Sequence, residues 1–184
     1  SHWFIECMER GAKLVTISPE YSPPATKSDY WIPIHPATDA ALFLGITRLM
    51  IEKGWYDRDF ILKFTDFPLL VRTDNLKRLR AHEVFPSYKL GLSNEGFSFR
   101  YQGLKQEQYE KIGDFVVWDI QKNGPAPITR DDVGARMSAK QIQPALEGKF
   151  VVKTSDGKEI EVMTLFSLYQ IHLKDYDLGT VAEV

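Results

Sequence analysis

The sequence is poor in the residues that build metal and redox centres. Cys7 is the only cysteine in 184 residues, so the chain cannot form an internal disulfide. A cysteine-bound iron–sulfur cluster usually needs about four such residues, so this chain alone cannot hold one. The histidines show no i, i+4 pair of the kind that binds a metal on a helix. We therefore predict a metal site at none of them: His2, His35, His82 and His172.

The chain also lacks a charge excess and a long apolar run. Lys and Arg number 23 against 25 Asp and Glu, which gives a formal charge of −2 and does not indicate a nucleic-acid partner. The apolar runs are far shorter than the ~20 residues that cross a bilayer. No start methionine, signal peptide or lipidation motif is visible, and we expect the chain to be a piece of a longer protein.

Motifs of common enzyme classes are missing as well. The sequence contains no Gly-x-Gly-x-x-Gly fingerprint, no phosphate-binding P-loop and no nucleophile elbow. It contains no complete Ser-His-Asp arrangement either. We therefore assign no catalytic residue.

The sequence does contain an alternating helix and strand pattern in its first 65 residues. The pattern predicts a helix ending near Gly11, a buried strand in "AKLVTIS", a loop, and a second strand in "YWIPI". A helix follows from Thr38 or Asp39 to about Lys53, with a further short helix in "DRDFILKFT". The long helix is expected to bury one face: Ala41, Leu42, Gly45, Ile46, Leu49 and Met50.

Polar segments follow both predicted strands. In α/β sheets of the Rossmann type, ligands bind at the carboxyl ends of the strands. If the two strands are parallel neighbours, residues 18–22 and 37–39 lie side by side at one edge of the sheet. The Asp39 carboxylate is then suited to accept hydrogen bonds from a donor pair such as guanine N1–H and N2–H₂, and the helix start favours anions. The alternative stays open: Thr38 and Asp39 only cap a helix, and "SPEYSPP" is only a loop.

The remaining chain is expected to be an insertion followed by a hairpin. In the middle part only Asp114–Ile120 indicates a strand, while "NGPAP" and "EGFSFRYQG" indicate turns or surface loops. Asp156-Gly157 lies between two alternating runs, which predicts a β-hairpin with Phe150, Val152, Ile160 and Val162 on one face. Helices follow in "TLFSLYQIHLKDY" and "DLGTVAEV". A basic stretch lines an anion path or forms a solvated face: Arg72, Lys77, Arg78 and Arg80.

The segment "KLVTISPEYSPPATKSDYWIPIHPATDAALFLG" resembles the molybdopterin oxidoreductases of the dimethyl sulfoxide reductase family. In that family, segments that correspond to residues 18–22 and 37–39 bind one guanine-dinucleotide arm of a bis-molybdopterin cofactor. Asp39 corresponds to the residue that binds the guanine. Many members have Gly-Thr-Asp where this chain has Ala-Thr-Asp, and alanine fits there if its φ is negative. The resemblance implies these cofactor-binding residues: Ser18, Pro19, Glu20, Tyr21, Ser22, Ala37, Thr38 and Asp39.

The run "FTDFPLLVRTD" is similar to the nitrate reductase branch of the family, and the chain looks most like nitrite oxidoreductase alpha subunits. This implies molybdenum-dependent oxidation of nitrite to nitrate, with the molybdenum ligand and the iron–sulfur ligands outside this chain. It further implies an iron–sulfur beta subunit, a haem or membrane gamma subunit, and association with the membrane on its periplasmic side, with the cytoplasmic side as the alternative. The alternatives are a nitrate reductase, another oxyanion or hydrocarbon enzyme of the branch, or a non-catalytic α/β scaffold.

The expected fold is therefore α/β, with a Rossmann-like cofactor-binding layer inside a larger multidomain chain. We divide the sequence into three parts. Residues 1–75 form the part that binds molybdopterin guanine dinucleotide, residues 76–147 form a loop-rich insertion, and residues 148–184 form the hairpin and the helices that lead back to the main domain.

Overall fold

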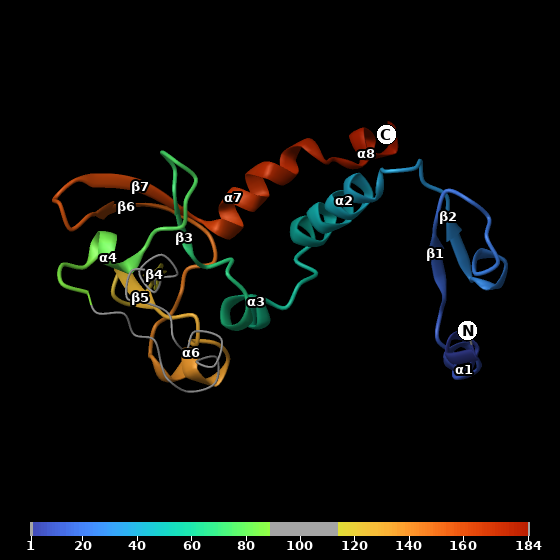
Figure 1. The fold of residues 1–184 in the computed structure, drawn as a ribbon, viewed down its shortest axis with the longest axis horizontal. Coiled ribbons are helices and arrows are strands. Elements are labelled where there is room, and N and C mark those ends of the chain that lie inside the picture. Colours follow the sequence, from blue (N-terminus) through green and yellow to red (C-terminus); the bar gives the residue numbers. More distant parts are fainter. Residues whose placement is uncertain (1, 89–113, 184) are drawn as a thin grey trace, which may run out of the picture. The chain divides into compact units, whose positions relative to one another are not determined.

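A computed structural model describes residues 2–88 and 114–183 of the chain (Figure 1). The fold divides into two compact units. The first, called the terminal unit below, combines Ser1–Gly54 with Leu173–Val184, and the second, the central unit, is Trp55–His172. The sequence analysis divided the chain into three parts according to their expected roles in cofactor binding. That division stays a prediction.

The terminal unit is built on a pair of parallel strands. Strand β1 (Val15–Ile17) pairs with β2 (Tyr30–Ile32) over three residues. The Asp29 carboxylate stabilises the start of this pair by accepting hydrogen bonds from the Lys13 ammonium at 2.7 Å and the Leu14 backbone N–H at 2.9 Å. The other elements of the unit are α1 (His2–Glu9), the 3₁₀ helix η1 (Ala25–Lys27), α2 (Asp39–Glu52), the 3₁₀ helix η3 (Leu173–Asp175) and α8 (Leu178–Glu183).

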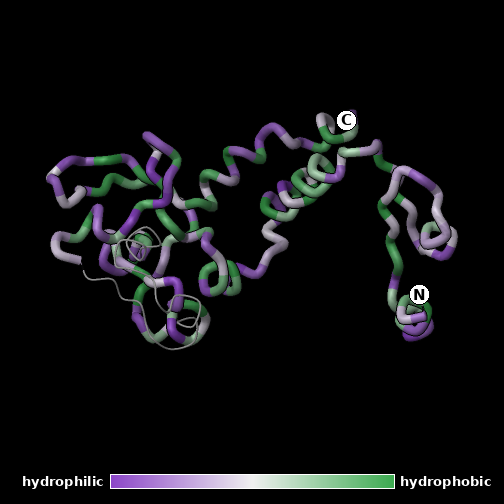
Figure 2. Tube along the Cα trace, in the orientation of Figure 1, coloured by the Kyte–Doolittle hydropathy of each residue, from purple (hydrophilic) through white to green (hydrophobic). Residues whose placement is uncertain are grey.

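The helices and strands of this unit lie where the sequence predicted them, but the predicted burial is wrong. The Val15 side chain on β1 is 48% exposed, and Gly45 is the only buried residue of α2. Ile46 and Met50 of the same helix are each about 40% exposed. Helix α2 packs mainly against α8 and η3, two short elements that leave much of its apolar face uncovered. Figure 2 shows the hydrophobic residues along these traces.

The central unit contains two small antiparallel sheets. One has the strand order β3-β7-β6, and the other pairs β4 with β5. Together with the helices packed around them, the elements of this unit are α3 (Arg58–Phe64), β3 (Leu70–Arg72), α4 (Ala81–Val84), β4 (Phe115–Asp119), β5 (Gly124–Ile128), α6 (Ala135–Ala139), β6 (Lys149–Lys153), β7 (Glu159–Thr164) and α7 (Leu165–His172).

The predicted hairpin is confirmed. Strands β6 and β7 pair in antiparallel register, with Phe150 opposite Val162 and Val152 opposite Ile160. The turn between them contains Gly157 with a φ of +88°, a backbone conformation that glycine adopts without steric cost. These four apolar side chains belong to one hydrophobic cluster of the core, together with residues of β3, α4 and β4.

The prediction of a turn or surface loop at "NGPAP" is wrong, because residues 124–128 form strand β5. Pro125 and Pro127 lie opposite Trp118 and Val116 in the two-stranded sheet. Proline has no N–H to donate to a neighbouring strand, but an edge strand tolerates it. Helix α6 was not expected either. The segment "EGFSFRYQG" lies outside the described residues.

Two arginines of the predicted basic stretch form ion pairs. The Arg72 guanidinium binds the Asp74 and Glu83 carboxylates, each at 2.7 Å, and Arg78 binds Asp66 at 2.5 Å. The Arg80 guanidinium lies over the Phe115 ring, 4.5 Å from its centroid. These contacts join neighbouring segments of the central unit, so the stretch contributes to its structure.

The expected fold class is confirmed, since helices and small sheets combine in a mixed α/β fold. The more detailed Rossmann-like arrangement stays a prediction. In the part of the chain that the structure describes, no helix is long and apolar enough to cross a membrane.

Candidate functional site

The two predicted polar segments lie at the carboxyl ends of β1 and β2. Residues 18–22 follow Ile17 directly, and residues 37–39 follow the second strand after the four residues 33–36. Because the strands are parallel neighbours, with Ile17 opposite Ile32, both segments leave the sheet at the same edge. The structure thus meets the condition on which the sequence prediction of a shared site depends.

The first segment forms a tight turn around one carbonyl group. The Ser18 hydroxyl donates to the Glu20 carbonyl oxygen at 2.7 Å, and the Ser22 N–H donates to the same oxygen at 2.9 Å. The Ser18 N–H donates to the Ile32 carbonyl of the neighbouring strand at 3.2 Å, which joins the turn to β2. The Glu20 side chain is exposed and takes no part in these bonds.

The second segment contains a residue in an unusual backbone conformation. Ala37 has a φ of +68°, in the left-handed region that favours glycine. The negative φ on which the fit of alanine was expected to depend is therefore not found. The left-handed conformation explains why glycine suits this position in the sequence pattern Gly-Thr-Asp.

Helix α2 begins without a side-chain cap. Thr38 is the N-cap residue, but its hydroxyl donates to the His35 carbonyl at 2.7 Å and caps no backbone N–H. The first backbone N–H groups of a helix have no partner inside it. They concentrate positive potential at the start of a 14-residue helix, where an anionic group is stabilised.

A cavity of about 820 Å³ lies between these segments and two helices of the terminal unit. Pro19, Glu20 and Thr38 of the eight predicted residues line it, whereas Tyr21 and Asp39, for example, do not. The volume is within the range of small-molecule sites, about 300–1,000 Å³. The full lining comprises Pro19, Glu20, Ile32, Pro33, Ile34, His35, Pro36, Thr38, Ala41, Leu42, Leu178, Val181 and Ala182.

One wall of this cavity comes from α8, more than 130 residues further along the sequence. A Cβ atom at Gly45 of α2 would lie 2.9 Å from Val181 Cγ2, so glycine lets the two helices approach closely. Asp177 caps α8 and accepts hydrogen bonds from the Thr180 hydroxyl at 2.6 Å and the Gly179 N–H at 3.0 Å. The Thr180 hydrogen bonds lower the pKa of Asp177. No sequence motif pointed to this wall, because "DLGTVAEV" carries no signal beyond its helical pattern.

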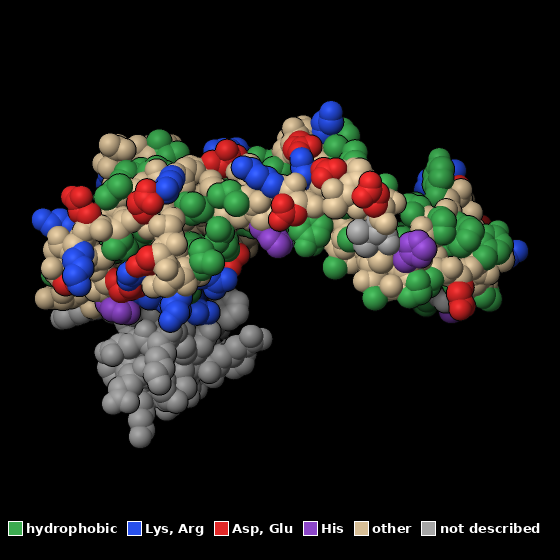
Figure 3. Space-filling model, turned by 90° about the horizontal axis from the view of Figure 1, so that it is seen from above, with side chains coloured by type: hydrophobic (Ala, Val, Ile, Leu, Met, Phe, Trp, Pro, Cys, Tyr) green, Lys and Arg blue, Asp and Glu red, His purple; other side chains and the backbone are tan. Residues whose placement is uncertain are grey.

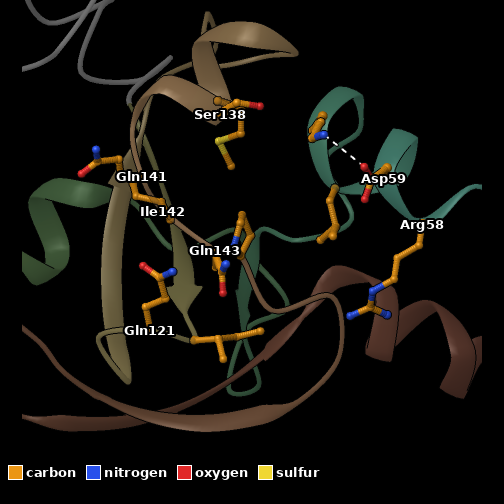
Figure 4. Close-up of a pocket in the computed structure, with 12 residues that line it drawn as sticks. Arg58, Asp59, Gln121, Ser138, Gln141, Ile142 and Gln143 are labelled. Carbon is orange, nitrogen blue, oxygen red and sulfur yellow. Dashed lines mark hydrogen bonds and ion pairs between the residues drawn. The ribbon is translucent and has the colours of Figure 1, made fainter.

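The central unit has a cavity of its own, of about 640 Å³ (Figure 4). Arg58 and Asp59 of α3 lie on one side of it, and Gln121 and Gln143 lie across from them. An ion pair of 3.1 Å joins Asp59 to Lys63. This cavity contains none of the predicted binding residues. Across the described residues no group of three or more His, Cys, Asp or Glu side chains is placed to hold a metal ion.

Comparison with known proteins gives the family. A family model described as molybdopterin oxidoreductase matches residues 3–177. The chain is 31% identical to the perchlorate reductase subunit alpha of Dechloromonas aromatica over 91% of its length. It is 30% identical to the chlorate reductase subunit alpha of Ideonella dechloratans over 96% of its length.

The respiratory nitrate reductase subunit alpha of Haloferax mediterranei is 29% identical over 98% of this chain. The chain spans 16–18% of the length of these three relatives. The family match covers nearly the whole sequence, including both polar segments and α2. This chain therefore belongs to the molybdopterin oxidoreductases, and these relatives are alpha subunits of the dimethyl sulfoxide reductase family.

Proposed function

We propose that this chain is part of the catalytic alpha subunit of a molybdenum enzyme that oxidises nitrite to nitrate. Its share of that function is to bind one guanine-dinucleotide arm of a bis-molybdopterin cofactor. The observation that carries the proposal is the pair of parallel strands whose carboxyl ends place Glu20 and Thr38 on one cavity of about 820 Å³.

The residues around this cavity fit a nucleotide. The uncapped N–H groups at the start of α2 suit a diphosphate, which needs donors and positive potential. Glu20 on the cavity and Asp39 in the first turn of α2 offer carboxylate oxygens, the acceptors that guanine N1–H and N2–H₂ require. The apolar side chains of Leu178 and Val181 provide a surface against which a purine ring packs.

When bound, the cofactor supplies the molybdenum that exchanges two electrons with the substrate. The balanced reaction converts nitrite and water into nitrate, two protons and two electrons. The residues of this chain hold and orient the nucleotide tail, at a distance from the reacting atoms. Loss of these residues is therefore expected to lower the cofactor content before it changes the rate of loaded enzyme.

The first test replaces Asp39 by alanine in the complete enzyme. The variant is expected to contain several-fold less molybdenum per alpha subunit, because a charge-assisted hydrogen bond to the base is lost. Asp59→Ala, a change of the same kind in the central unit, serves as the matched control and should leave the molybdenum content unchanged. Normal molybdenum together with normal activity in Asp39→Ala would falsify the role of Asp39 as guanine partner.

A second candidate function is oxyanion reduction. The names of the relatives favour it, since they are reductases of perchlorate, chlorate and nitrate.

To distinguish the two candidate functions, molybdenum and iron are measured per alpha subunit of the native complex. Nitrite oxidation with an artificial electron acceptor is then assayed beside nitrate reduction with a reduced dye. Dominant nitrite oxidation supports the main proposal, and dominant reduction of nitrate or another oxyanion replaces it. Absence of molybdenum would return both polar segments to a purely structural role.

The proposal includes partner subunits. The relatives are named as alpha subunits, which implies that they assemble with other subunits. For this enzyme we propose an iron–sulfur beta subunit and a haem or membrane gamma subunit that accept the electrons. This places the enzyme at a membrane, on the periplasmic side in our proposal. Purification of the complex from membranes, with haem and iron measured in each subunit, tests these assignments.

A further inference from the structure

Trp31 contacts the first cofactor-binding segment from the neighbouring strand. It lies in the middle of β2, opposite Thr16, and is 37% exposed. Its indole N–H lies 3.2 Å from both the Ser18 carbonyl oxygen and the Ser18 hydroxyl oxygen. A single donor is thus shared between two acceptors of the residue that begins the turn.

The same ring also contacts the other half of the turn. Tyr21 packs against Trp31 in an edge-to-face arrangement, with the ring centroids 5.0 Å apart and the planes at 67°. This arrangement suits the charge distribution of two aromatic rings. Trp31 therefore holds both Ser18 and Tyr21, and Glu20 lies between these two anchored positions.

Two further hydrogen bonds hold the backbone of Glu20. Its carbonyl oxygen accepts from the Ser18 hydroxyl and from the Ser22 N–H, so its side chain leaves the turn in a defined direction. Glu20 and Pro19 line the cavity, whereas Trp31 does not, although its neighbour Ile32 does. Any effect of Trp31 on the cavity therefore passes through the turn.

We infer that Trp31 is a positioning residue for the nucleotide arm: it holds the turn of residues 18–22 in the shape that presents Pro19 and Glu20 to the cavity. This inference rests on the proposed function. A turn held in its binding shape before the ligand arrives loses less conformational entropy on binding, so its rigidity contributes to affinity. None of the sequence motifs singled out this tryptophan, because it lies in a strand and not in either polar segment.

The test uses the complete enzyme prepared without its cofactor and titrated calorimetrically with GDP, which carries the guanine, ribose and diphosphate of the arm. The binding component that Asp39→Ala and Glu20→Gln remove or weaken is the one that this chain carries. Trp31→Phe keeps a ring beside Tyr21 but removes the indole N–H. We expect its Kd for that component to rise about five-fold, the usual effect of one lost hydrogen bond.

Two further variants separate positioning from general stability. Trp3→Phe removes an indole from the same unit, where the ring packs on His2, and should leave the Kd unchanged. In the double variant Ser18→Ala with Trp31→Phe, the two effects should combine to less than their product, because Ser18→Ala removes one of the two oxygens that accept the indole N–H. All titrations are made at a temperature where thermal unfolding shows every variant to be folded.

The outcomes are distinct. A Trp31→Phe variant with a lower Tm and an unchanged Kd overturns the inference, since the tryptophan then serves stability alone. If GDP binding is unaffected by both Asp39→Ala and Glu20→Gln, the proposed function itself fails, whatever Trp31→Phe does.

Discussion

The two units of this chain differ in how much apolar surface they bury. In the central unit, two clusters of buried hydrophobic residues connect the sheets and helices. Among the described residues of the terminal unit, only two hydrophobic residues are buried, Ala25 and Leu173. Large apolar side chains of the terminal unit stay on the surface (Figure 3).

The two units are expected to differ in how much a bound ligand stabilises them. The cavity with the predicted binding residues belongs to the unit with the smaller core. Elements with few buried contacts open at low free energy, and a ligand that binds only the folded state raises that free energy by mass action. The terminal unit is therefore expected to gain most of the stability that a bound nucleotide provides.

The largest expected effect compares a phenylalanine in each unit. Phe166 of α7 is 1% exposed and packs on Phe67 and Tyr56, whereas Phe43 of α2 is 53% exposed. Phe166→Ala is expected to cost about 3–5 kcal/mol of unfolding free energy through the cavity that it leaves. Phe43→Ala should cost less than about 1 kcal/mol, because a surface change leaves no buried void.

Urea unfolding with hydrogen exchange measures both variants. Hydrogen exchange is needed because two units that open separately do not give a single two-state transition. In Phe166→Ala the loss of amide protection should concentrate in the central unit, at strands such as β3 and β7. Equal losses for the two variants would contradict the contrast between the units.

A second expected difference between the units concerns backbone conformation. Both units contain several residues in the left-handed region, among them Gly157 at φ +88° in the central unit and Ala37 at φ +68° in the terminal unit. A side chain in this region costs roughly 1–2 kcal/mol, partly offset by the lower entropy of the unfolded chain. Ala37→Gly should therefore stabilise the terminal unit by about 1 kcal/mol, and Gly157→Ala should destabilise the hairpin by a similar amount.

Thermal unfolding of the two variants measures these opposite signs. No heavy atom lies within 4 Å of a Cβ built on Gly157, so steric contact with neighbours does not complicate the reading there. Ala41→Gly, inside α2, is the control for Ala37 and should destabilise by about 1 kcal/mol, since glycine weakens a helix interior. A loss of stability in Ala37→Gly would show that the left-handed conformation is not a source of strain.

Local patterns in the sequence predicted the helices and the hairpin well. Alternation of Phe150, Val152, Ile160 and Val162 around Asp156-Gly157 fixed the register, because a shift by one residue would expose the whole face. The long helix was equally clear, since its apolar spacing begins after Thr38 and ends before Gly54. The strand at residues 124–128 was missed because prolines usually indicate a turn, and only the edge position makes them acceptable.

The candidate site was predictable only in part. The pattern of two strands, each followed by a polar segment, was sufficient to predict that Ser18–Ser22 and Ala37–Asp39 lie at one edge of the sheet. The contribution of Leu178 and Val181 to the cavity could not be predicted, because it depends on a contact between distant parts of the chain. Trp31 was missed for a similar reason, since its side chain on β2 contacts the turn that follows the neighbouring strand β1. The binding role of all these residues stays a prediction.

The smallest expected effect concerns one exposed carboxylate in each unit. Hydrogen bonds from the Thr154 hydroxyl and the Lys158 ammonium lower the pKa of Asp156 in the hairpin to about 2. In the terminal unit, hydrogen bonds from Lys13 and the Leu14 N–H lower the pKa of Asp29. Both folded-state values lie below the ordinary value, so each contribution to stability is complete above about pH 4 and is lost as the pH falls through the folded pKa.

NMR titration of the side-chain carboxyl carbons measures these values directly. Lys13→Gln should move the midpoint of Asp29 back toward its ordinary value and leave that of Asp156 unchanged, whereas Thr154→Val should do the reverse. Because both carboxylates are exposed, the effects on unfolding are small, and the titration midpoint is the sensitive measurement. An ordinary midpoint for Asp29 in the unaltered chain would mean that its hydrogen bonds with Lys13 and the Leu14 N–H, at the start of β1 and β2, do not persist in solution. The alignment of the two polar segments would then depend on the strand pairing and the Trp31 contacts alone.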